Sequence, residues 1–211
     1  GRLWITSLLW GLAVATKLTP LIFAPIIWFR ISRKQRFSFF GLAFLLNVLL
    51  FLPLFHLSTV EHIFSSINLY FQHFEFNASI YFILRAIGTF LYGYNPIATL
   101  GPSLSILTFL GIWWISYMYR QKSYIEVGLW VQLLFILFAT TVHPWYLFPL
   151  VMFSSLSTWR FPLVWSVCIF LTYFSYGTVP YKENLYLVGL EYILVIGYIG
   201  YEYRSSQNEH L

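Results

Sequence analysis

The sequence predicts an all-α protein, a polytopic membrane helix bundle of about eight spans with interfacial helices in the 57–96 region. Of the 211 residues, 59% are hydrophobic and only 9% are charged, whereas a soluble domain carries about 25% charged residues. The mean hydropathy is +0.73, and long apolar stretches recur between short polar turns. So few charges cannot cover a water-exposed surface, which excludes a cytosolic enzyme, a disordered chain and a nucleic-acid-binding domain. The single cysteine excludes a disulfide-rich module.

The spans follow from the length of each apolar stretch. A transmembrane helix needs about 20 mostly apolar residues, and shorter ones are tolerated where neighbouring helices bury their ends. The predicted spans are 3–16, 19–29, 37–57, 97–119, 124–142, 145–159, 161–177 and 185–203. We expect residues 1–211 to form a single transmembrane domain. Because the chain begins Gly1-Arg2 without an initiator methionine, we expect it to be the C-terminal part of a longer protein.

The first two spans form one apolar stretch, residues 3–29, that Lys17-Leu18-Thr19-Pro20 interrupts. One kinked helix would hold the Lys17 ammonium deep in the hydrocarbon, which is costly. Two short helices joined at this tetrapeptide would let Lys17 reach the membrane interface. The sequence therefore favours a hairpin, with the kinked helix as the alternative.

Orientation follows from lysine and arginine, which collect in cytoplasmic loops. Nine of the twelve basic residues fall on one side of the predicted bundle: Arg2, Arg30, Arg33, Lys34, Arg36, Arg120, Lys122, Arg160 and Arg204. Lys17, Arg85 and Lys182 fall on the other side. We expect a multi-pass protein of the cell membrane with both ends of this chain in the cytoplasm. The net charge of +5 then requires no nucleic-acid partner.

Residues 57–96, between the third and fourth spans, are too amphipathic for a span and too long for a simple loop. Around residues 63–74, apolar residues recur at helical spacing with polar residues between them, which predicts a helix lying in the interface plane on the non-cytoplasmic side. Asn77 or Ser79 is expected to cap a second short helix. Arg85 then lies one or two turns into this helix.

The Arg85 guanidinium lies among apolar residues at a membrane face and needs an anionic partner. Glu75 or a set of backbone carbonyls is one alternative. The other is a phosphate, because the planar fork of guanidinium donors suits phosphate oxygens.

A second polar group on this face is His143-Pro144-Trp145-Tyr146, in which Pro144 is well placed to open a helix. The following apolar stretch of about 15 residues measures roughly 22 Å. This is shorter than a bilayer core of about 30 Å. His143 is therefore expected below the outer surface, lining a cavity, where it binds either a neighbouring helix end or a sugar hydroxyl or phosphate.

Lys17, Arg85 and His143 come from separate regions of the chain and map to the same face, which favours recognition of a phosphate. The predicted substrate-binding residues are Lys17, Glu75, Asn77, Arg85, His143 and Tyr146. One histidine without a second ligand at metal spacing does not indicate a metal site. We expect no cofactor, with a divalent cation left open, and Lys182 and Glu183 are expected in a solvated turn.

Residues 11–25, from Gly11-Leu12-Ala13 through Lys17 and Pro20 to Pro25, resemble the hairpin of integral-membrane GT-C glycosyltransferases. More narrowly, they resemble the bacterial polyprenyl-phosphate-mannose-dependent mannosyltransferases. Phe76-Asn77-Ala78-Ser79 and His143-Pro144-Trp145-Tyr146 are similar to recurring elements of that branch.

The resemblance implies an inverting transferase with its active site on the non-cytoplasmic face. It would move a hexose, here mannose, from a polyprenyl-phosphate donor to a lipid-linked or other glycan acceptor, with Lys17 near the donor phosphate. The family's catalytic acidic residue is usually an aspartate in a loop that precedes the matched region. This sequence contains no aspartate, so the resemblance assigns no catalytic residue.

Two other classes of function stay open. A transporter or flippase of a lipid-linked sugar or another anion would also use broken helices and a cationic cavity. Glu191 is the one clear acidic candidate within a span, whereas coupled transport usually needs a relay of ionisable groups. A non-catalytic membrane subunit would use its polar groups only to satisfy helix ends.

Overall fold

The computed structural model describes residues 2–56, 58–59, 61–63, 65–66, 74–177 and 183–208. Within these ranges the chain is helical, apart from turns and one isolated parallel bridge between Phe76 and Thr141. This confirms the all-α prediction. The α-helices are α1 Leu3–Thr16, α2 Ala24–Trp28, α3 Arg33–Phe51, α5 Ile80–Tyr92, α6 Ile97–Met118, α7 Tyr124–Phe138, α8 Phe148–Ser155, α9 Phe161–Cys168 and α10 Leu185–Asn208. The 3-10 helices are η1 Thr19–Phe23, η2 Leu52–Leu54, η3 Pro144–Leu147 and η4 Ile169–Gly177.

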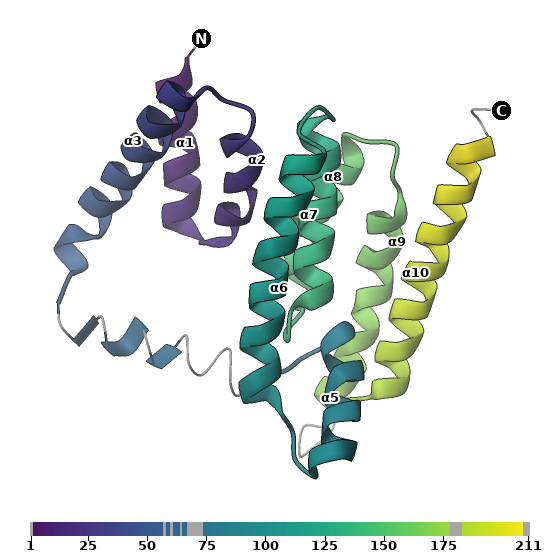
Figure 1. Cartoon of the computed structure of the whole chain (residues 1–211). Helices are drawn as coiled ribbons and strands as arrows, with labels where there is room; N and C mark the ends of the chain where they lie inside the picture. The colour runs from purple at the N-terminus through teal and green to yellow at the C-terminus, as the bar shows by residue number, and fades with distance from the viewer. Residues whose placement is uncertain are drawn as a thin grey trace.

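The helices form two groups (Figure 1). One consists of α1, α2 and α3, and the other consists of α6 to α10 side by side, with α5 at one end of the molecule. The closest pairs are α1 with α3, α6 with α7, and α9 with α10, and α2 joins the groups by packing against α6. Both termini, the α2–α3 turn and the α6–α7 turn lie at the end opposite α5.

In the described part of the chain, three helices are long and apolar enough to cross a membrane, namely Arg33–Leu54, Ile97–Met118 and Leu185–Ser205. Membrane association is therefore supported, but the predicted number of eight spans is not confirmed. The other predicted spans form shorter helices. For example, the predicted span 124–142 ends as a helix at Phe138, because Ala139 is extended and the residues after it pair with the segment around Phe76.

The surface is consistent with lipid as solvent. Large apolar side chains point outward on both groups, among them Phe44 at 70% exposed, Phe90 at 88% and Ile193 at 70%. An exposed apolar surface of this kind marks contact with a membrane or with another protein. The buried core lies inside the second group, where Leu129, Phe161 and other apolar side chains are fully enclosed.

The predicted hairpin is present. Helix α1 ends at Thr16, Lys17 is extended (φ −159°, ψ 137°), and η1 begins two residues later with Pro20 in its first turn. Proline lacks a backbone N–H and fixes φ, so it fits a helix start and does not extend the preceding helix. The alternative of one continuous kinked helix is therefore wrong.

Helices α1 and α3 pack through small and polar residues. A Cβ atom added to Gly11 would lie 3.2 Å from the Cα atom of Ala43, so the two backbones are close. The Asn47 side-chain amide donates hydrogen bonds to the carbonyls of Gly11 (3.0 Å) and Ala43 (2.9 Å). Small residues and cross-helix hydrogen bonds are typical of helix packing in membranes, where lipid removes the hydrophobic driving force.

The second short helix predicted in the 57–96 region is α5, and its N-cap residue is Ser79. Asn77 does not cap it, because Asn77 lies two residues earlier in a left-handed conformation (φ 45°) with its side chain buried. Ser79 makes no capping bond either, since its hydroxyl donates to the Leu137 carbonyl at 2.8 Å. The predicted interfacial helix around residues 63–74 lies largely outside the described residues.

Candidate functional site

Lys17 lies at the mouth of a cavity between the first hairpin and the start of η3. Its ammonium is 5.0 Å from the centroid of the Tyr146 ring, and its side chain is exposed. Lys17, Gln132, Trp145 and Tyr146 line the cavity, together with apolar residues of η1 and α7, and its volume is about 460 Å³. A cation therefore lies at the entrance of a largely apolar space.

Gln132 is the most buried polar side chain of this cavity, which Thr16 and Thr19 also line. It is 1% exposed, and its side-chain N–H donates to the Tyr146 carbonyl at 3.2 Å. Its Oε1 atom is buried and has no hydrogen-bond partner among the described residues. Buried polar atoms without a partner are uncommon in folded proteins. Gln132 thus offers an acceptor oxygen to a hydroxyl or N–H group that enters the cavity.

His143 lies beside the cavity in an aromatic stack. Its ring is 4.4 Å from the Trp145 ring at 15° and 5.0 Å from the Phe76 ring at 29°. Burial lowers the pKa of His143, and the positive charge of Lys17 lowers it further. Its Nδ1 atom is buried without a partner in the described part of the chain. Burial thus favours the neutral imidazole, which can act as a hydrogen-bonding group, and no hydrogen bond from its Nδ1 atom to a helix end occurs among the described residues.

Arg85 lies in a separate cluster. It forms an ion pair with Glu75, and both side chains are about three-quarters buried (22% and 25% exposed). The same carboxylate accepts hydrogen bonds from the Tyr81 hydroxyl (2.5 Å) and the Asn95 amide (3.2 Å). Burial raises the pKa of Tyr81, and the neighbouring Glu75 adds to the effect. The partner of Arg85 in the structure is therefore Glu75.

Asn77 is fully buried and binds two carboxylates. Its backbone N–H donates to Glu183 at 2.5 Å, and its side-chain amide lies 3.2 Å from both carboxylate oxygens of Glu191. The Trp165 indole also donates to Glu191 (2.7 Å), and the Tyr192 hydroxyl donates to the Asn77 carbonyl (2.7 Å). These bonds fix the segment before α5 against α9 and α10.

Glu183 is half-buried beside this cluster, and not in the solvated turn that the sequence predicts. Burial raises its pKa from 4.5 to about 7, nearby Glu75 contributes in the same direction, and the hydrogen bond from Asn77 and the charge of Arg85 oppose the shift. Lys182, predicted in the same turn, lies outside the described residues.

The six predicted site residues thus divide into two clusters. Lys17, His143 and Tyr146 come together at the cavity. Glu75, Asn77 and Arg85 form polar bonds within the protein, and Phe76 connects the clusters by stacking on His143. The sequence analysis missed Gln132, although a glutamine within the apolar stretch 124–142 is itself a signal, because polar side chains inside spans are rare. Within the described residues, no three His, Cys or Glu side chains come close enough to bind a metal.

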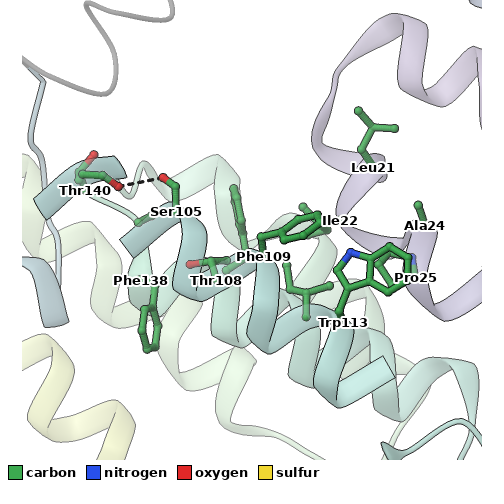
Figure 2. Close-up of a pocket in the computed structure, with 14 residues that line it drawn as sticks. Leu21, Ile22, Ala24, Pro25, Ser105, Thr108, Phe109, Trp113, Phe138 and Thr140 are labelled. Carbon is green, nitrogen blue, oxygen red and sulfur yellow. Dashed lines mark hydrogen bonds between the residues drawn. The ribbon is translucent and has the colours of Figure 1, made fainter. Parts of the chain in front are cut away.

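A second cavity adjoins the first. Figure 2 shows Leu21, Ile22 and Pro25 of the hairpin facing Phe109 and Trp113 of α6 across it. Its volume is about 390 Å³, and its lining is apolar apart from the hydroxyls of Ser105, Thr108 and Thr140. Ile22 and Phe135 line both cavities, so the second cavity lies next to the one that holds Lys17 at its mouth.

Comparison with protein-family models, curated proteins and solved structures found no match to this chain.

Proposed function

We propose that this chain is part of a membrane glycosyltransferase that moves a hexose, mannose in the first instance, from a polyprenyl-phosphate donor to a lipid-linked or other glycan acceptor. The observation that carries the proposal is the position of Lys17 at the mouth of a largely apolar cavity, which shares Ile22 and Phe135 with a second apolar cavity beside it. An isoprenoid phosphate has the matching chemistry, with an anionic head and an apolar tail.

The charge on Lys17 is available for a ligand. Among the described residues the one ion pair is that of Arg85 and Glu75, so no described carboxylate is paired with Lys17. When the sugar leaves the donor, negative charge develops on the phosphate, and a cation fixed beside it lowers the barrier. The Gln132 Oε1 atom supplies an acceptor for a sugar hydroxyl, and the neutral His143 supplies a further hydrogen-bonding group.

The basic residues support a non-cytoplasmic position for this site. The turns that hold Arg30–Arg36 and Arg120–Lys122 lie at the end of the molecule opposite α5. Because cytoplasmic loops are enriched in lysine and arginine, that end is assigned to the cytoplasm and the end with α5 to the other side. Both termini of the chain are then cytoplasmic.

Transfer also requires a base that removes a proton from the acceptor hydroxyl. Glu75 is bound to Arg85, and Glu191 is enclosed by Trp165 and Asn77. Neither of these carboxylates lines the Lys17 cavity. We therefore assign the donor site to this chain, and we assign no catalytic base among its described residues.

The test is sugar release from a polyprenyl-phosphate-mannose donor by the natural protein that contains this chain, purified in detergent. Lys17→Ala is expected to slow release about 100-fold, the magnitude found when one group that stabilises a developing oxyanion is removed. Lys34→Ala is the matched control, because Lys34 is exposed at the start of α3 and far from the cavity in sequence and structure. Unchanged release by Lys17→Ala would overturn the proposal.

Transport of a lipid-linked sugar or another anion is the second candidate, and one observation favours it. Glu191 is 0% exposed within the candidate span of α10. Buried ionisable residues in spans often mark ion or proton pathways. The discriminating measurement is proton-dependent flux of a labelled lipid-linked sugar into liposomes. Flux that Glu191→Gln abolishes, without sugar release from the donor, would favour transport over transfer.

A further inference from the structure

A polar cavity of about 620 Å³ lies at the end of the molecule opposite α5, between the α2–α3 turn and the α6–α7 turn. Three basic residues line it, Arg30 from the first turn and Arg120 and Lys122 from the second. No acidic residue is among the described residues that line it. Three positive charges therefore face one space without a carboxylate to neutralise them.

Neighbouring residues hold the Arg30 side chain in place but accept hydrogen bonds from only some of its N–H donors. Its guanidinium carbon lies 4.0 Å from the centroid of the Tyr124 ring, and one terminal nitrogen donates to the Tyr119 carbonyl at 3.3 Å. Its Nε–H is buried and has no acceptor among the described residues. An arginine guanidinium carries five N–H donors, so most of the donors of Arg30 are free for a ligand.

Arg120 and Lys122 supply the other two positive charges that face this cavity. Arg120 donates to the Tyr117 carbonyl at 2.8 Å and lies over the Tyr117 ring at 4.5 Å, which orients its guanidinium. Lys122 lines both this cavity and an adjoining one, where Glu126 is also found.

Helix α7 begins at this cavity. Ser123, its N-cap residue, accepts a hydrogen bond from the Ile125 N–H at 3.2 Å and lines the cavity. The N-terminus of a helix carries a partial positive charge and unpaired N–H groups, which attract anions. The helix end therefore adds to the field of the three side chains.

We infer that this cavity binds a phosphate group, with Arg30 and Arg120 as the directional donors and Lys122 as an additional charge. Arginine donors match phosphate oxygens in a fork geometry, and lysine acts as a point charge. The cavity lies at the end of α6, a candidate membrane span, where lipid headgroups are found. The phosphate comes from an anionic lipid headgroup or from free phosphate.

The position of the site gives the bound phosphate a structural role. Arg30 belongs to the group of α1, α2 and α3, whereas Arg120 and Lys122 belong to the group of α6 to α10. A phosphate held by both turns links the two groups beside the contact of α2 with α6. Ligand that binds only the folded state stabilises it by mass action, so binding is expected to raise the unfolding temperature.

The experiment measures lipid binding to the purified protein in neutral detergent, by native mass spectrometry and by thermal unfolding. The probes are short-chain phosphatidic acid, phosphatidylcholine of the same chain length, and inorganic phosphate. We expect one tightly bound phosphatidic acid, a rise of several degrees in unfolding temperature, and affinity at least tenfold above that for phosphatidylcholine. Saturable binding of inorganic phosphate at equal strength would identify the free anion as the source.

The variants are Arg30→Gln, Arg120→Gln and Lys122→Gln, each expected to weaken binding at least tenfold. Lys122→Gln keeps the test valid if an arginine variant folds poorly, because the one hydrogen bond that Lys122 makes to a described residue comes from its backbone N–H, and its side chain makes no hydrogen bond or ion pair with the described residues. Arg33→Gln is the matched control, because Arg33 is exposed at the same end and does not line the cavity. If Arg33→Gln weakens phosphatidic acid binding as much as the cavity variants do, the proposed site is overturned. The lipid would then be attracted to basic residues at this end of the molecule in general. Equal binding of phosphatidylcholine would overturn it as well.

Discussion

The side-chain amide of Asn77 lies 3.2 Å from both carboxylate oxygens of Glu191, 114 residues later in the chain. Asn77 reaches this position in a left-handed conformation (φ 45°), which asparagine adopts more readily than most residues. The Trp165 indole binds the same carboxylate. Glu191 therefore connects three segments, the extended residues before α5 and helices α9 and α10.

Replacing Glu191 tests this connection. Glu191→Ala leaves the buried Trp165 indole N–H without an acceptor, and an unsatisfied buried donor costs about 1–3 kcal/mol, more when the partner was charged. We expect Glu191→Ala to lower the free energy of unfolding by roughly 2–4 kcal/mol, measured by denaturant titration in detergent. Glu191→Gln keeps an acceptor for Trp165, and its amide can donate to the unpaired Oδ1 of Asn77.

Glu191→Gln is therefore expected to cost less than half as much as Glu191→Ala. Glu61→Gln is the control, because Glu61 is exposed. Equal losses for Glu191→Gln and Glu191→Ala would show that the charge, and not the hydrogen bonds, holds the three segments together.

Local sequence predicts much of this fold. The hairpin at Lys17 follows from a lysine and a proline within one apolar stretch, and the predicted spans 97–119 and 185–203 begin at the same residues as α6 and α10. The early end of α7 could not be predicted, because it depends on pairing between Phe76 and residues near Thr140, which are distant in sequence.

The site was predictable to a similar extent. Counting the predicted membrane crossings along the chain places Lys17 and His143 on the same side of the membrane. The structure brings both residues next to Tyr146. The sequence could not decide between Glu75 and a phosphate as the partner of Arg85, because both have the required charge. The bonds of Asn77 to Glu183 and Glu191 depend on the packing of distant helices, which no local pattern encodes.

The close contact of α1 with α3 predicts sensitivity to size at Gly11. A Cβ there would lie 3.2 Å from the backbone of Ala43, so Gly11→Val must separate the helices. Overpacking of this kind typically costs about 1–3 kcal/mol, and we expect that loss in the free energy of unfolding. Gly41→Val is the matched control in α3, because a Cβ at Gly41 meets nothing within 4 Å. The contact is not tight if the two variants unfold at the same denaturant concentration.

The stability of the protein is expected to fall as pH rises through neutrality, because of Glu183. Its pKa is raised by burial from 4.5 to about 7. Between these values the folded protein holds a proton that the unfolded chain releases. The stabilisation is therefore complete below the unfolded pKa of 4.5 and is lost as pH rises through about 7. Burial is the main cause of the raised pKa, and of the charged neighbours Glu75 raises it further while Arg85 lowers it.

The measurement is the unfolding temperature from about pH 5 to about pH 8, for the unchanged protein and for Glu183→Gln. Glutamine still accepts the hydrogen bond from the Asn77 N–H but does not titrate in this range. The difference between the two proteins isolates Glu183 from the other carboxylates. We expect a shallower decline for Glu183→Gln, and identical slopes would contradict the assignment.

Substitutions of Gln132 distinguish a role in donor binding from a role in protein stability. Gln132→Leu removes a buried oxygen that has no partner, together with one hydrogen bond to Tyr146. The lost hydrogen bond to the Tyr146 carbonyl destabilises the variant, and removal of the unpaired, desolvated Oε1 stabilises it, so the two effects oppose each other. The free energy of unfolding should therefore change by less than about 1 kcal/mol. Affinity for the polyprenyl-phosphate sugar should nevertheless fall at least tenfold, because the sugar loses its acceptor.

Gln132→Glu is expected to lower the free energy of unfolding, unlike Gln132→Leu, and to weaken donor binding as Gln132→Leu does. It places a buried carboxylate in the cavity, where none of the described lining residues is acidic; this group must be desolvated, and it repels the donor phosphate near Lys17. Both variants are measured by donor binding in detergent and by denaturant titration of the empty protein. If Gln132→Leu binds the donor as well as the unchanged protein, the unpaired oxygen of Gln132 is not a ligand contact, and the donor site must be built on Lys17 and His143 without it.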